Sequence, residues 1–345
     1  MRQQAAQTAA YSPRQERLGR ALFRGGSLHM GNPEYCRTTR VLLTELLDSD
    51  VGYGDLTVAA LQLADQHVSV VDQHASAKIQ AKEPGVIAGV AEFCWLLMRD
   101  DLEIRVRKKD GEAIEAGDIV LEIEGRRRDL LAHERVGLNL LQRLSGIASG
   151  TKRLQELLHR HNPQAHVVAT RKTPWGLLDK RAVHIGGGGT HRLGLWDAIL
   201  VKNNHLALLA NREEEAVGLA VERAWPARKS AAFIEVEVRS EQGALAAAQA
   251  FGRVQESSQK EPDRDFPCLL LLDNMSPAKI AGIIEDLRAH NLLEHVLTEA
   301  SGNISESNVG EYATCGVDAI SMGALTHSAR ALDLCERFSG PKEKP

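Results

Sequence analysis

Five basic residues lie at the ends of two short apolar runs, or beside a run of glycines, between residues 167 and 205. They are Arg171, Lys172, His191, Arg192 and Lys202. Arginine binds carboxylates and phosphates through its planar fork, and lysine binds them as a point charge. Cations gathered where strands give way to loops therefore predict a site for a small molecule with several negative charges. The alternative is a solvated basic surface, which usually carries acidic neighbours on a helix.

Polar residues also end the apolar runs that follow Gly150. The runs are Val167–Thr170, Ala198–Lys202, Phe233–Val238, Leu269–Asp273, Val296–Ser301 and Val317–Met322. The polar residues at their ends are Arg171 and Lys172, then Lys202, Glu237, Asp273, Glu299 with Ser301, and Gly323. The carboxyl ends of successive parallel strands are where (β/α) barrels build active sites. This half of the chain is therefore predicted to carry a catalytic site on a parallel sheet.

The segments between these runs are amphipathic and are expected to be helices, so that strands and helices alternate as in a parallel sheet covered by helices. They are Glu213–Ala224, Gln242–Phe251, Pro277–His290 and Glu306–Thr314. The glycines at 186–189 lack the spacing of a dinucleotide-binding loop and do not open a helix. They indicate a sharp, close-packed turn.

The first half of the chain has a different pattern. Helices are expected at Thr38–Leu47 and Gly89–Met98, and strands at Val68–Val71 and Ala77–Ala81. Two alternating runs flank a turn at Asp110-Gly111, and we expect them to pair: Leu102–Val106 and Ile119–Ile123. A long helix is expected to begin near Arg126. The phrase DGEAIEAGDIVLEIEG is also compatible with half of a biotinyl or lipoyl domain, but no second half with a modifiable lysine follows.

Composition excludes several classes of protein. The 345 residues carry a formal net charge of −4 and 4% aromatics, which argues against nucleic acid as the main partner. Five cysteines without a CxxC pair indicate reduced thiols in a cytoplasmic protein. No apolar run approaches the roughly 18 residues that a membrane helix requires. Residues 1–33 are rich in Arg, Gln and Ala with Glu16 as the only acid. We expect a floppy extension, with a transit peptide or a helix on a subunit surface as the alternatives.

Segments spread over most of the chain resemble quinolinate phosphoribosyltransferase, also called nicotinate-nucleotide pyrophosphorylase (carboxylating). Three carry the core of the resemblance: TRKT at Thr170–Thr173, GGGGTHRLGLWD at Gly186–Asp197 and VKNNH at Val201–His205. The others are GDLT, AKEPGVIAG, ERVGLNLLQRLSGIASGT, IEVEV, LLLLDNMSP, EASGNIS and GVDAISMGALTHS. Each is a modest signal alone, and in this order they are highly specific.

The resemblance implies an α/β fold, with an N-terminal α/β sandwich domain followed by an open seven-stranded α/β barrel. We expect an extension at residues 1–35, the sandwich domain at 36–149 and the catalytic barrel at 150–324. A C-terminal helix at 325–345 is expected to pack on the sandwich domain. The resemblance also implies a homodimer, or a higher assembly, whose sites are completed across the subunit interface.

By similarity, the enzyme is a pentosyltransferase of NAD biosynthesis. It joins quinolinate to phosphoribosyl pyrophosphate with Mg²⁺, giving nicotinate mononucleotide, pyrophosphate and carbon dioxide. The residues implied to hold quinolinate are Arg135 (from the neighbouring subunit), Arg171, His191, Arg192 and Lys202. Those implied to serve phosphoribosyl pyrophosphate are Lys172, Glu237 and Asp273, with Ser301, Gly302 and Gly323 near its 5′-phosphate. The expected catalytic residues are Lys172, Glu237 and Asp273, of which Glu237 and Asp273 are the expected metal ligands, partly through substrate and water.

The chain departs from the family pattern in two places. Asn203 stands where the family usually has aspartate, and Pro174-Trp175-Gly176 replaces the common Thr-Pro-Gly. Three other readings of the basic site stay open. They are a Schiff-base lyase with Lys202 as the covalent lysine, a paralogue with another pyridine or phosphoribosyl acceptor, and a barrel that binds an anion without turnover.

Overall fold

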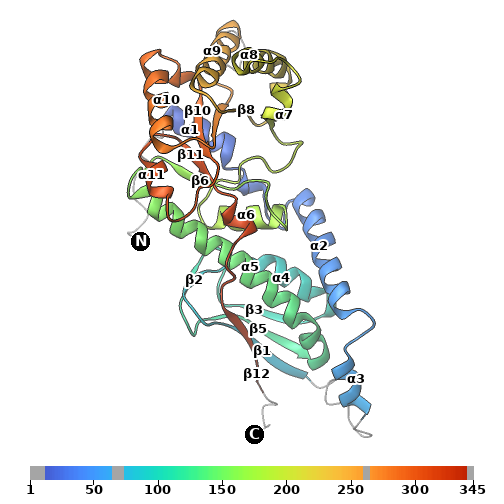
Figure 1. The fold of residues 1–345 in the computed structure, drawn as a ribbon. Coiled ribbons are helices and arrows are strands. Elements are labelled where there is room, and N and C mark those ends of the chain that lie inside the picture. Colours follow the sequence, from blue (N-terminus) through green and yellow to red (C-terminus); the bar gives the residue numbers. More distant parts are fainter. Residues whose placement is uncertain (1–11, 64–73, 259–264, 340–345) are drawn as a thin grey trace, which may run out of the picture. The chain divides into compact units, whose positions relative to one another are not determined.

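The computed structural model describes residues 12–63, 74–258 and 265–339 (Figure 1). The chain divides into two compact units. The first, the parallel-sheet unit, takes in residues up to Arg24, Leu154–Arg171 and Gly189–Gly323. The second, the antiparallel-sheet unit, takes in Gly25–Arg153, Lys172–Gly188 and the residues from Ala324 onward.

The parallel-sheet unit contains six strands in the order β6-β11-β10-β9-β8-β7, and all five pairings are parallel. The strands are β6 (His166–Val168), β7 (Ile199–Val201), β8 (Ile234–Val238), β9 (Cys268–Asp273), β10 (Leu297–Ser301) and β11 (Ala319–Ser321). Each falls within an apolar run predicted as a strand or begins or ends within a residue of it. Their leucine-, isoleucine- and valine-rich sequences suit a sheet covered on both faces.

A seventh strand was expected, and the described residues contain only a single bridge in its place. Gly189 pairs in parallel with Val168 at the free edge of β6. The next two backbone N–H groups, of Thr190 and His191, donate to the carbonyl of Leu22 at 2.7 and 3.1 Å. Because these donors are used outside the sheet, the pairing stops after one residue.

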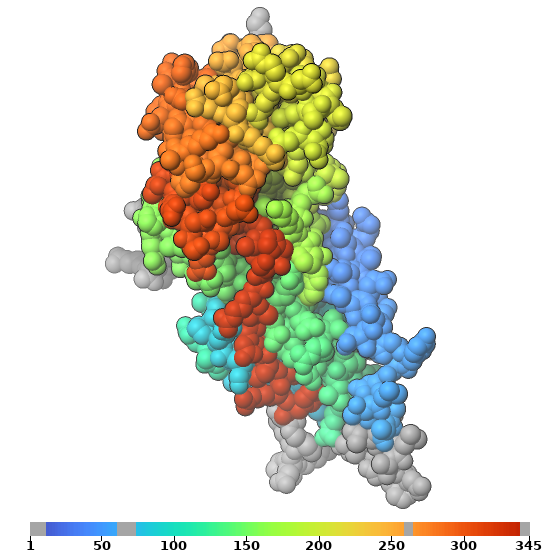
Figure 2. Space-filling model, viewed as in Figure 1, coloured from blue at the N-terminus to red at the C-terminus, as the bar shows by residue number. Residues whose placement is uncertain are grey.

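Helices of the parallel-sheet unit follow its strands, and Figure 1 draws α8, α9 and α10 on the outside of the sheet. In the space-filling view their yellow and orange segments form the surface of this unit (Figure 2). The helices are α1 (Pro13–Leu22), α7 (Asn203–Leu206), α8 (Glu213–Ala224), α9 (Glu241–Ser257), α10 (Pro277–Ala289) and α11 (Val309–Ala313). The amphipathic segments predicted as helices are thereby confirmed, with α11 shorter than expected.

Helix α1 differs from the extension expected at residues 1–35. Ser12 caps it by accepting from the backbone N–H of Gln15, and Pro13 occupies its first position. Leu18, Ala21 and Leu22 are buried, at the i, i+3, i+4 spacing of one helix face. They pack in one cluster with residues that belong to the six strands or directly precede them: Val168, Ala198, Phe233, Leu269, Leu297 and Ala319. One short helix can reach six strands only if the sheet curves around it.

The antiparallel-sheet unit has a four-stranded sheet in the order β12-β1-β5-β3 and a two-stranded sheet of β2 and β4. The strands are β1 (His74–Ala81), β2 (Gly85–Val86), β3 (Glu103–Val106), β4 (Ala113–Ile114), β5 (Ile119–Arg126) and β12 (Leu334–Ser339). β3 pairs antiparallel with β5 and sets Ile104 opposite Ile123, as the sequence predicted. The predicted strand Val68–Val71 lies outside the described residues.

Residues 325–345 were expected to form a helix, and the structure has a strand there instead. Among the described residues 325–339, only those of α12 (Ala324–His327) are helical, and β12 pairs antiparallel with β1, with Leu334 opposite Ala81. The pairing satisfies the backbone groups of an otherwise open edge of β1. The C-terminal segment therefore does belong with the first half of the chain, as an added strand.

Helices of the antiparallel-sheet unit are α2 (Pro33–Val51), α3 (Leu56–Leu63), α4 (Val90–Leu97), the start of α5 (Arg127–His159), α6 (Leu177–Ile185) and α12. Short 3-10 helices occur at Gly25–Ser27, Met98–Asp100, Trp225–Ser230 and Leu293–His295. Residues 172–188 join this unit, although we expected them in the barrel. Buried Asp179 explains the difference, because it accepts from Nε and Nη2 of Arg143, both at 2.8 Å. Within the described residues no helix has the length and apolar character to cross a membrane.

Candidate active site

The two-residue repeat of a strand decides which side chains share a face in the parallel-sheet unit. Phe233 packs against α1, so Glu235 and Glu237 of the same strand point to the same side as Phe233. The same count from Leu269 reaches Asp273 at the end of β9. On the other strands, counting from the residues that contact α1 reaches Lys202, Ser301 and Gly323. These five predicted residues therefore lie on the concave face, at the carboxyl ends of neighbouring strands.

Two carboxylates lie at adjacent strand ends. Glu237 is mostly buried and accepts from Asn203 Nδ2 at 2.8 Å. Asp273, on the neighbouring strand, accepts from Arg239 Nη2 at 3.1 Å. Burial, and then the charge of Asp273, raise the pKa of Glu237 above its usual value. Raised carboxyl pKa values in a polar edge of this kind are typical of sites that take a cation or transfer a proton.

Arg239 is a polar residue at this edge that sequence reasoning missed. It follows β8, and its guanidinium also lies 3.8 Å from Glu237 Oε1. The signal was present in the sequence, because 235, 237 and 239 alternate along one face. Asn203, where the family pattern has aspartate, supplies an N–H donor to Glu237. An aspartate there would instead add a third negative charge.

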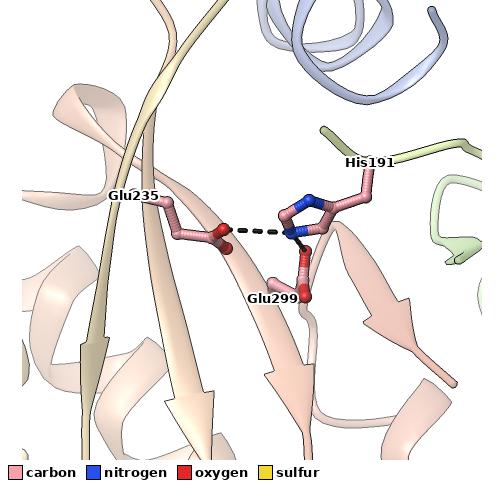
Figure 3. Close-up of side chains that lie close together, drawn as sticks. All are labelled: His191, Glu235 and Glu299. Carbon is pink, nitrogen blue, oxygen red and sulfur yellow. Dashed lines mark ion pairs between the residues drawn. The ribbon is translucent and has the colours of Figure 1, made fainter. Parts of the chain in front are cut away.

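His191 and two acidic residues form a buried cluster deeper on the same face (Figure 3). His191 Nε2 lies 3.0 Å from Glu235 Oε2 and 3.5 Å from Glu299 Oε2. All three side chains are almost fully buried, and their ligand atoms lie within 4.8 Å of one another, as a metal site would require. The backbone N–H of Arg192, however, donates to His191 Nδ1 at 2.7 Å. In a neutral ring the proton then resides on Nε2, which favours donation to the carboxyls over a metal bond.

Two arginines approach each other above this cluster. Arg192 is 6% exposed, and its pKa is lowered by burial and by the nearby charge of Arg171. Like charges held together repel, so a bound dianion would stabilise the pair. Arg171 and Lys202 are both exposed, so a ligand could reach them.

Ser301 is the last residue of β10, and Gly302 follows it, close to the residues that follow β9. The Ser301 carbonyl accepts from the N–H of Asn274 at 2.9 Å. Gly302 has φ 103°, and a Cβ at this position would lie 2.2 Å from Asn274 Oδ1. Only glycine fits here, because both the backbone conformation and the space exclude a side chain.

Two of the predicted residues, Lys172 and Arg135, lie in the antiparallel-sheet unit. Lys172 is exposed, and its carbonyl accepts from Thr326 Oγ1 at 2.9 Å. Thr173 Oγ1 and the Trp175 N–H both donate to Asp179, which orders the loop after Lys172. Arg135 lies on α5 with 60% of its side chain exposed. The structure thus brings together the acidic and basic residues of the parallel-sheet unit, while Lys172 and Arg135 belong to the other unit.

The curved parallel sheet carries the basic residue Lys202 and the acids Glu237 and Asp273 at its carboxyl edge. This arrangement is typical of an α/β enzyme fold that binds an anionic substrate. Comparison with known families is specific. The model of the N-terminal domain of quinolinate phosphoribosyl transferase matches residues 55–145, and that of its C-terminal domain matches residues 147–335. The chain belongs to the quinolinate phosphoribosyltransferase family.

Relatives and solved structures agree with this assignment. A probable nicotinate-nucleotide pyrophosphorylase [carboxylating] of Archaeoglobus fulgidus is 37% identical over 287 residues, covering 83% of this chain and 98% of the relative. The Bacillus subtilis protein of the same name is 34% identical over 300 residues, covering 85% and 91%. The nicotinate-nucleotide pyrophosphorylase structure from Francisella tularensis has a TM-score of 0.72 at 29% identity, covering 88% of this chain and 96% of that one. NadC from Streptococcus pyogenes has a TM-score of 0.71 at 34% identity, covering 88% and 96%.

Proposed function

We propose that this enzyme transfers the phosphoribosyl group of phosphoribosyl pyrophosphate to quinolinate and releases carbon dioxide, forming nicotinate mononucleotide and pyrophosphate. The observation that carries the proposal is the concave face of the parallel sheet. It sets Lys202 near the acids Glu237 and Asp273. It also sets buried Arg192, with Arg171 near it, close to Glu235. Quinolinate is a dicarboxylate that needs cations, and the sugar donor needs a site that tolerates positive charge at its anomeric carbon.

Glu237 and Asp273 fit a Mg²⁺ site. Mg²⁺ prefers oxygen ligands and is usually bound by one or two carboxylates together with substrate phosphates and water. Burial, and then the charge of Asp273, raise the pKa of Glu237, and a bound cation would stabilise the ionised pair. A bound Mg²⁺ would neutralise the departing pyrophosphate, and Lys172 would share that role.

The decarboxylation step requires little proton transfer by the protein. Ribosylation makes the pyridine nitrogen cationic, so the ring can accept the electrons left behind when the adjacent carboxylate departs as carbon dioxide. The residues of this chain then have to bind, orient and shield the substrate. Arg171, Arg192 and Lys202 would hold the carboxylates, and Ser301, Gly302 and Gly323 would lie near the 5′-phosphate.

The working form is proposed to be a homodimer, or a larger assembly, in the cytoplasm. Arg135 is exposed on α5 and would complete the quinolinate site of a neighbouring subunit. All five cysteines are unpaired, which suits a reducing compartment.

Kinetics of two variants test the assignment of the site. Arg171→Ala removes a carboxylate fork and is expected to raise the KM for quinolinate about tenfold. Asp273→Ala removes charge stabilisation at the sugar and is expected to lower kcat about a hundredfold. Arg253→Ala is the matched control, because Arg253 lies on the outer helix α9 with 59% of its side chain exposed and pairs with Glu222 at 3.7 Å.

Unchanged kinetics in both site variants would refute the assignment. A covalent adduct at Lys202 after borohydride treatment with a carbonyl substrate would instead favour a Schiff-base enzyme.

A further inference from the structure

The end of helix α1 is bonded to the segment that carries His191 and Arg192. The Leu22 carbonyl accepts from the N–H groups of Thr190 and His191 at 2.7 and 3.1 Å. The N–H of Arg24 donates to Thr190 Oγ1 at 3.1 Å. Thr190 is fully buried, so these bonds are shielded from water.

The Arg24 side chain binds Asp197, at the other end of the same segment. Its Nε lies 3.0 and 3.1 Å from the two carboxylate oxygens of Asp197, and its Nη2 lies 2.9 Å from Oδ1. Asp197 is 4% exposed and also accepts from the N–H of Leu193 at 2.8 Å. A charged fork on a buried carboxylate is among the stronger polar contacts of a protein. The segment Thr190–Asp197 is therefore bonded at both ends to residues 22–24.

This segment has a conformation that needs such support. His191 has φ 53°, in the left-handed region that side-chain-bearing residues rarely adopt. Gly189, two residues earlier, lies so close to its surroundings that a Cβ would meet Val168 Cγ1 at 2.6 Å and the Leu22 carbonyl oxygen at 3.1 Å. The direction in which His191 and Arg192 project thus depends on contacts with the end of α1.

We propose that Leu22 and Arg24 are positioning residues for quinolinate binding, acting through His191 and Arg192. The inference rests on the proposed function. Both residues precede the first residue matched by either family model, residue 55, so the segment 12–24 would be a part of the substrate site contributed from outside the matched domains. Glu237 and Asp273 are held by the pairing of β8 with β9. Loss of Arg24 should accordingly affect quinolinate and spare phosphoribosyl pyrophosphate.

Steady-state kinetics and hydrogen exchange of Arg24→Ala test the inference. We expect the KM for quinolinate to rise about tenfold, with the KM for phosphoribosyl pyrophosphate and kcat within about twofold of the parent. The amides of Thr190, His191 and Leu193 should exchange faster. Arg24→Lys keeps the charge without the fork and should recover part of the affinity. Arg20→Ala is the control, because Arg20 lies four residues earlier, on α1, and donates to the carbonyl of Asp265.

A double-mutant cycle tests whether Arg24 acts through Asp197. If Arg24 acts through Asp197, then Arg24→Ala combined with Asp197→Asn should raise the KM for quinolinate no more than the stronger single variant. A uniform loss of kcat, an unchanged KM, or unchanged amide exchange would each overturn the inference. Failure of the parent protein to convert quinolinate would instead remove the proposed function, and the exchange rates would still decide whether Arg24 holds the segment.

Discussion

Glu235 is expected to make the stability of the parallel-sheet unit depend on pH. It is fully buried, and burial raises the pKa of its carboxyl to about 8; Arg192 opposes this rise, while Glu237 adds to it. The carboxyl is therefore largely uncharged in the folded protein at neutral pH, beside the ring of His191. Since the same group ionises near pH 4.5 when unfolded, the folded state binds more protons between those two pH values, and its stability falls as pH rises.

The variant Glu235→Gln should remove this dependence. The loss of stability due to Glu235 approaches about 1.4 kcal/mol per pH unit where the difference is greatest. Between pH 5 and pH 8, urea unfolding should show a larger loss of unfolding free energy for the parent than for Glu235→Gln. Glu222→Gln is the matched control, because the Glu222 side chain is 54% exposed. Parallel pH profiles for the parent and Glu235→Gln would show that the carboxyl titrates normally.

At the residue scale, the sequence predicted the residues whose position follows from the two-residue repeat of a strand. Lys202, Glu237 and Asp273 end apolar runs, and alternation places them on the face that α1 contacts. Arg24 could not be found in this way, because its partner Asp197 lies 173 positions further along the chain. Such pairings depend on the fold, and a single sequence carries no local signal for them.

Helix α1 is the element whose role differs most from expectation. Its cap and first position, Ser12 and Pro13, and its apolar spacing at Leu18, Ala21 and Leu22 are local signals of a helix. Its arginine-rich composition suggested an exposed extension. The burial partners belong to, or directly precede, six distant strands, and only the curvature of the sheet brings them to one place. The strand β12 was missed for a similar reason, since its partner β1 is far away in sequence.

Truncation of the buried face of α1 tests its structural importance. Leu18 is 1% exposed, and Leu18→Ala is expected to destabilise the protein by about 2–4 kcal/mol through lost burial and a cavity. Urea unfolding monitored by circular dichroism measures the change. Leu208→Ala serves as a control, because Leu208 is 83% exposed. If Leu18→Ala lowers the free energy of unfolding by less than about 0.5 kcal/mol, as surface substitutions do, α1 contributes little to stability and is an extension, as first expected.

At the scale of the whole molecule, the site residues that the family resemblance implies are divided between the two units of the chain. Arg171 belongs to one unit and Lys172 to the other, so the boundary falls within the TRKT motif. The exposed Arg135 belongs to the same unit as Lys172. The assembly cannot be predicted from strand patterns, because an interface is formed by surfaces with no periodic signal.

Subunit complementation tests whether Arg135 serves a neighbouring subunit. Arg135→Ala and Lys202→Ala should each be nearly inactive alone. After unfolding and refolding together, mixed dimers would contain one intact site, and an equal mixture should regain about a quarter of the parent activity. Activity no higher than the sum of the separate variants would place both residues in the site of one chain.

The central claim is that this protein couples phosphoribosyl transfer to loss of a carboxylate. The most direct measurement is the yield of all three products from quinolinate labelled in the carboxylate adjacent to nitrogen, with phosphoribosyl pyrophosphate and Mg²⁺. We predict equimolar nicotinate mononucleotide, pyrophosphate and labelled carbon dioxide, with none formed from nicotinate. Pyrophosphate release with nicotinate and without carbon dioxide, or tight quinolinate binding without any product, would contradict the claim.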